Sequence, residues 1–81
     1  MLKNVMRNIA ESEKVFMTLA AGGASMEMEF DEPEVLFEGG CYHIEDSSGL
    51  RLTVNPDDAT VTREGDYYKI AGTSYEIYLD L

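Results

Sequence analysis

The sequence predicts an α+β fold, in which an N-terminal amphipathic helix precedes an antiparallel β-meander of about five to six short strands. Apolar residues recur at three- and four-residue steps before Gly22-Gly23, and they alternate with polar residues after it. Turn-forming residues then return roughly every eight to twelve residues. This spacing is typical of a meander that curls into a small barrel or is covered by the helix.

The first predicted element is a helix from about Leu2 to Ala21, which Gly22-Gly23 would end. Residues with a high helix propensity are abundant in this stretch, and Glu13 is the only charged residue on its apolar stripe. The stripe consists of Leu2, Val5, Met6, Ile9, Phe16, Met17 and Ala20.

A competing interpretation ends this helix near Ser12. Residues 15–20 would then form a strand, and a turn at residues 21–24 would pair it with a second strand over residues 25–30. Short apolar runs fit both patterns, so periodicity alone does not decide between them.

The clearest strand signal is the alternation of Met26, Met28 and Phe30 with acidic residues, which describes one apolar and one acidic face. Further strands are expected over residues 41–46, 50–54, 60–63, 67–71 and 75–81, separated by turns that contain Gly, Pro, Asn or Asp, and residues 35–37 form a short apolar run. The predicted core consists of Met26, Met28, Phe30, Leu50, Leu52, Val54, Ile70, Ile77 and Leu79.

The length of 81 residues predicts a single domain over residues 1–81 with a small core. Hydrophobic residues make up 44% of the chain, as is usual for a globular domain. No apolar run is long enough for a membrane span or for the hydrophobic region of a signal peptide. We therefore expect a cytoplasmic protein, and the lone Cys41 is consistent with that compartment.

The net charge of −10 argues against direct binding to nucleic acid or to an anionic membrane, because Lys and Arg supply that attraction. The charge is concentrated, since residues 15–50 contain carboxylates but no Lys or Arg. Those carboxylates are Glu27, Glu29, Asp31, Glu32, Glu34, Glu38, Glu45 and Asp46, and we predict that they bind a partner.

Glu27, Glu29 and Asp31 would form a row along one strand face, at a spacing of about 6.7 Å for every second residue. Neighbouring backbone phosphates of a nucleic-acid strand have a similar order of separation, about 3.4 Å of axis per charge. Such a row could imitate nucleic acid to a basic groove of a protein. A simpler interpretation is a solvated face that maintains solubility and discourages edge pairing.

Cys41, His43 and Glu45 share one strand face, which would suit a thiolate nucleophile or part of a metal site. Adjacent side chains on a strand point in parallel rather than converging, and a metal needs three or four converging ligands. We therefore predict no catalytic residue, no metal and no cofactor.

Tyr67 and Tyr78 fall opposite the apolar face of their strands, so both are expected to be exposed. Exposed tyrosines are enriched in protein interfaces, and we include both in the predicted binding surface.

These observations predict a small acidic, non-enzymatic module that binds a basic surface, for example on a nucleic-acid-binding protein. Its concrete form is a nucleic-acid-mimicking inhibitor of the kind that phages and mobile elements use, with which it shares only size and charge. The alternative is a structural or assembly subunit that forms a homo-oligomer through the helix and the tyrosine-bearing strands.

Overall fold

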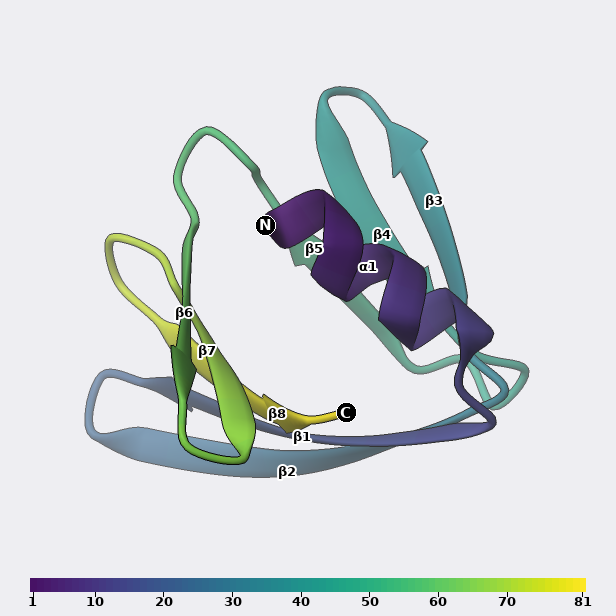
Figure 1. Cartoon of the computed structure of the whole chain (residues 1–81), viewed down its shortest axis with the longest axis horizontal. Helices are drawn as coiled ribbons and strands as arrows, with labels where there is room; N and C mark the ends of the chain where they lie inside the picture. Colours follow the sequence, from purple (N-terminus) through teal and green to yellow (C-terminus); the bar gives the residue numbers. More distant parts are fainter.

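One helix and eight antiparallel strands, arranged in two sheets, make up the chain in a computed structural model that describes residues 1–81 (Figure 1). The elements are α1 (Leu2–Glu11), β1 (Lys14–Ala21), β2 (Ala24–Asp31), β3 (Glu34–Glu38), β4 (Cys41–Glu45), β5 (Arg51–Val54), β6 (Thr60–Glu64), β7 (Tyr67–Ala71) and β8 (Glu76–Asp80). The predicted α+β class with a β-meander is confirmed, with more strands than the five to six expected.

The larger sheet has five strands in the order β2-β1-β8-β7-β6, and the smaller sheet has three in the order β3-β4-β5. No strand pairing joins the two sheets, so the small closed barrel is wrong. The chain passes from the larger sheet to the smaller sheet at Glu32-Pro33, between β2 and β3. Glu32 has a φ of 49°, and Pro33 has no amide to donate to a ladder.

The predicted helix from Leu2 to Ala21 is wrong, and the competing interpretation is confirmed. The helix ends at Glu11, where the Ser12 hydroxyl donates to the Asn8 carbonyl at 2.7 Å. Beyond it, β1 pairs with β2 on one side and with β8 on the other. These two ladders satisfy the backbone of β1 without a helix. Glu13, which did not fit the helical stripe, is an exposed residue between α1 and β1.

A two-residue turn at Gly22-Gly23 connects β1 to β2. Their φ angles of 58° and 81° are the positive values that tight hairpin turns require, and glycine adopts them without steric cost. The turn closes on the Ala21–Ala24 pair, and this register continues without a bulge to Lys14–Asp31.

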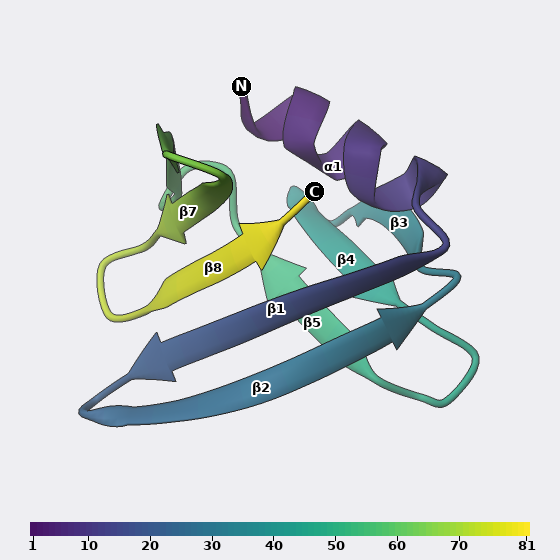
Figure 2. The same cartoon turned by 60° about the horizontal axis from the view of Figure 1, so that its bottom comes forward.

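The core lies between the two sheets, with α1 covering one end (Figure 2). It comprises Val5, Met6, Ile9, Val15, Met17, Met28, Phe30, Ile44, Val54, Ile70, Ile77 and Leu79. The helix contributes its apolar stripe to this core, so that stripe is not free for another chain. No helix in the structure is long and apolar enough to cross a membrane.

Six of the nine predicted core residues are buried, namely Met28, Phe30, Val54, Ile70, Ile77 and Leu79. Leu50 and Leu52 are only partly buried, and they pack against the core. Met26 is 54% exposed, so its predicted burial is wrong. It pairs with Leu19 near the hairpin turn, and the hairpin extends there beyond α1 (Figure 1).

Candidate functional site

One face of the five-stranded sheet is turned away from the core, and none of its residues is buried. We call it the outer face. From the strand registers it consists of Ser25, Glu27, Glu29 and Asp31 on β2; Lys14, Phe16, Thr18 and Ala20 on β1; Glu76, Tyr78 and Asp80 on β8; Tyr67, Lys69 and Ala71 on β7; and Thr60, Thr62 and Glu64 on β6. The helix and the smaller sheet lie on the opposite side (Figure 1).

The outer face is acidic, with carboxylates from β2, β6 and β8 and only two lysines. The Lys14 ammonium lies 3.0 Å from Glu29, and its pKa is raised by the hydrogen bond to that carboxylate. The Lys69 ammonium lies 3.6 Å from Glu64 and 3.7 Å from Glu76, which also raise its pKa. No ion pair forms at the remaining carboxylates of the face, Glu27, Asp31 and Asp80.

Three aromatic side chains lie on the outer face, Phe16 on β1, Tyr78 on β8 and Tyr67 on β7. Phe16 is 59% exposed, and Tyr67 is 39% exposed. The Tyr67 and Tyr78 rings lie 5.8 Å apart between centroids. Aromatic side chains that are partly exposed in this way can bury a large area against a partner at low entropic cost.

The two tyrosine hydroxyls donate hydrogen bonds to neighbouring carboxylates, Tyr67 to Glu64 at 3.2 Å and Tyr78 to Glu76 at 3.0 Å. These bonds stabilise the protonated phenols, so the pKa of each tyrosine is raised. The carboxylates therefore hold the aromatic rings in place on the outer face.

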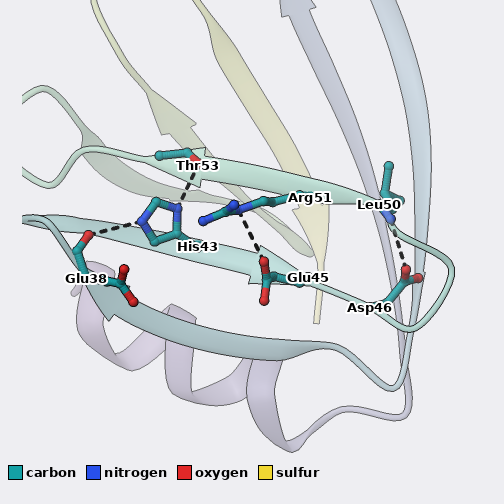
Figure 3. Close-up of polar contacts among 7 residues, drawn as sticks. All are labelled: Glu38, His43, Glu45, Asp46, Leu50, Arg51 and Thr53. Carbon is teal, nitrogen blue, oxygen red and sulfur yellow. Dashed lines mark hydrogen bonds and ion pairs between the residues drawn. The ribbon is translucent and has the colours of Figure 1, made fainter.

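The predicted binding residues divide between two regions. Five of them lie together on the outer face, namely Glu27, Glu29, Asp31, Tyr67 and Tyr78. Another four, Glu32, Glu34, Glu45 and Asp46, surround a hollow at the β2–β3 and β4–β5 connections, and Glu38 lies at the far end of β3. Within the second region, Glu45 forms an ion pair with Arg51 at 3.2 Å (Figure 3).

Asp46 has a structural role in the β4–β5 turn. Its Oδ1 accepts from the Leu50 amide at 3.3 Å (Figure 3) and from the Ser48 amide at 3.0 Å. Its Oδ2 accepts from the Asp31 amide at 3.0 Å. The carboxylate thereby connects the smaller sheet to the end of β2.

These bonds favour the charged form of Asp46, with the Ser48 hydroxyl as the largest cause, and lower its pKa. The resulting stabilisation is present above the unfolded pKa, near 3.8, and is lost as the pH falls through the lower folded value. We expect Asp46→Asn to be less stable than the parent at pH 7. The difference should shrink as the pH is lowered below about 4, which urea denaturation at several pH values would measure.

Cys41, His43 and Glu45 lie on one face of β4, as expected, but their side chains do not converge. His43 Nε2 lies 3.0 Å from the Glu38 carbonyl, and a carbonyl can only accept, so Nε2 carries the proton. Nδ1 lies 2.9 Å from the Thr53 hydroxyl and accepts from it in the neutral ring (Figure 3). Both ring nitrogens thus hold β3, β4 and β5 together.

The Cys41→Ser variant tests whether the thiol takes part in function. We expect this variant to bind partners and to unfold as the parent does, because Cys41 is partly exposed and free. A loss of function with an unchanged circular dichroism spectrum would instead assign a role to the thiol.

The sequence-based reasoning missed Phe16 and the lysines of the outer face. Phe16 was placed on the apolar stripe of a long helix, whereas the strand turns it away from Val15 and Met17. Lys14 and Thr18 alternate with the apolar Val15, Met17 and Leu19, and this alternation, taken as a strand, places Phe16 on the polar face.

No protein-family model, curated protein or solved structure matches this chain.

Proposed function

We propose that the protein is a non-enzymatic binding module whose outer face docks on a basic surface of another protein. The row of Glu27, Glu29 and Asp31 on β2 carries this proposal. All three side chains are exposed, and only Glu29 has a basic partner within the chain. An acidic surface that is not neutralised internally is complementary to a basic one.

The concrete form of the proposal is inhibition of a nucleic-acid-binding protein by imitation of the nucleic acid. Glu27, Glu29 and Asp31 present carboxylates at a spacing of about 6.7 Å, which is of the same order as the axial spacing of about 3.4 Å per phosphate along a nucleic-acid strand. Phe16, Tyr67 and Tyr78 would add apolar contact area beside this row, where nucleic acid would present bases.

The test begins with capture of partners at low salt on the immobilised protein, followed by purification of each partner. We expect the affinity for a purified partner to fall at least about tenfold between 50 and 200 mM salt, because exposed charges are screened. We also expect the partner's own nucleic acid to compete with the module. An affinity that is insensitive to salt, or a ternary complex that retains the nucleic acid, would contradict the proposal.

Assembly into a homo-oligomer is the second candidate, and the exposed aromatic side chains favour it. The helix is not available for this role, because Val5, Met6 and Ile9 are buried in the core of their own chain. A contact between two outer faces would also bring like charges together. Sedimentation at high salt, where that repulsion is screened, separates the two candidates, because only the oligomer would then form.

A further inference from the structure

The edge strand β2 is unusual in being long, regular and unpaired on one side. It has eight residues and no bulge, and β1 is its only strand neighbour. The other edge of the same sheet, β6, has five residues. An exposed edge of this length is a template for pairing with another strand.

The direction of the free backbone groups follows from the register. In an antiparallel pair, residues alternately bond to the neighbouring strand and point away from it. The Asp31 amide donates to the Asp46 side chain, which lies outside the β1–β2 ladder, so Asp31 points to the open edge. By alternation, Ser25, Glu27 and Glu29 also direct their amides and carbonyls to that edge.

The residues with outward backbone groups therefore also carry the acidic side chains of the outer face. A strand that bonded to Glu27 and Glu29 would place its own side chains directly beside these two carboxylates. Its intervening side chains would lie beside Met26, which is 54% exposed, and Met28. The edge thus complements a strand with basic and apolar residues in alternation.

We propose that β2 binds an extended segment of another protein by strand addition, and that this segment alternates basic with apolar residues. The inference rests on the proposed function and specifies how the basic partner is held. A second copy of this chain is disfavoured at the same edge, because antiparallel pairing of two β2 strands would bring their carboxylates together. The acidic row therefore blocks self-pairing and still admits a basic strand.

The test uses an eight-residue peptide of alternating lysine and valine, with blocked ends, and the full chain. Two further peptides carry backbone N-methyl groups, one on the lysines and one on the valines. All three have the same charge, but only methylation of the lysines removes the amides that would face Glu27 and Glu29. We expect the valine-methylated peptide to bind like the parent peptide and the lysine-methylated one to bind at least about tenfold more weakly.

A matched pair of protein variants tests strand addition by changing β2 instead of the peptide. Glu27→Gln and Glu27→Pro each remove one charge, but only proline removes the outward amide, and proline is tolerated on an edge strand where the amide faces solvent. We expect the proline variant to bind the parent peptide roughly 2- to 10-fold more weakly than the glutamine variant. Circular dichroism would verify that both fold, and the methylated peptides decide the question if the proline variant does not.

The outcomes separate the two proposals. Equal binding of both methylated peptides, weakened by salt, would overturn strand addition and leave the acidic docking face standing. Equal binding of a serine–valine peptide and the lysine–valine peptide would show that charge has no role, and it would overturn both.

Discussion

Phe30→Ala is expected to cost about 3–5 kcal/mol of folding free energy, the typical loss for truncating a buried phenylalanine. Phe30 is completely buried, and it pairs with the equally buried Val15 in the middle of the core. A domain of this size has a total stability of about 4–12 kcal/mol at roughly 0.05–0.15 kcal/mol per residue. Urea denaturation followed by circular dichroism should therefore show a much lower midpoint, or no folded baseline at all.

Phe37→Ala provides the control, because it removes the same atoms from the surface. Phe37 is 62% exposed, and its ring lies 4.8 Å from the Tyr42 ring between centroids. We expect a loss of less than about 1.5 kcal/mol, the upper range for an aromatic pair. Similar losses in the two variants would mean that Phe30 is not at the centre of the core.

The burial of Phe30 could be predicted from sequence because β2 alternates strictly. Only one register places its apolar residues on a common face, and a slip by one residue would bury Glu27 and Glu29 instead. The structure has both glutamates exposed, so the predicted register is confirmed. Local pattern was sufficient wherever one face of a strand was clearly polar.

The boundary between α1 and β1 could not be predicted in the same way. Residues 15–20 have apolar side chains on both faces of the strand, a pattern that helix and strand share. The deciding interactions are the ladders to β2 and β8, and β8 lies about sixty residues away in sequence. Such long-range pairing leaves no local signal, and it overrides helix propensity.

The acidic row of the candidate site could be predicted from the sequence, but the set of residues from different strands that join it on the outer face could not. The assembly of Phe16, Tyr78 and Tyr67 on one face requires β1, β8 and β7 to be neighbours, which only the topology provides. The role of Asp46 could not be predicted either, because its bond to the Asp31 amide joins the β4–β5 turn to the end of β2, 15 residues earlier in the chain. The amino-acid composition predicts that the surface is acidic, and the fold determines which of the charged residues lie next to one another.

Reversal of Glu27, Glu29 and Asp31 to lysine is expected to have the largest effect on partner binding. The change adds six positive units to one strand face, so long-range attraction to a basic partner becomes repulsion. We expect the association rate to fall about 10- to 1,000-fold, with the largest defect at low salt, as stopped-flow mixing with a purified partner would measure. The fold should survive, because the three side chains are exposed and only the Lys14–Glu29 pair is lost, which contributes less than about 1 kcal/mol.

The matched control reverses Glu11, Asp57 and Asp66, which are exposed carboxylates outside the outer face, and it adds the same total charge. Asp58 is unsuitable for this control because its carboxylate accepts hydrogen bonds from Thr73.

Since the two variants have equal net charge, a larger defect in the β2 variant would locate binding on the outer face. Equal defects would mean that only the overall charge matters, and unchanged binding in both would mean that the acidic row serves solubility alone. In that last case the exposed aromatic residues of the outer face become the expected contact surface, and Phe16→Ser should then weaken self-association while the charge reversals do not.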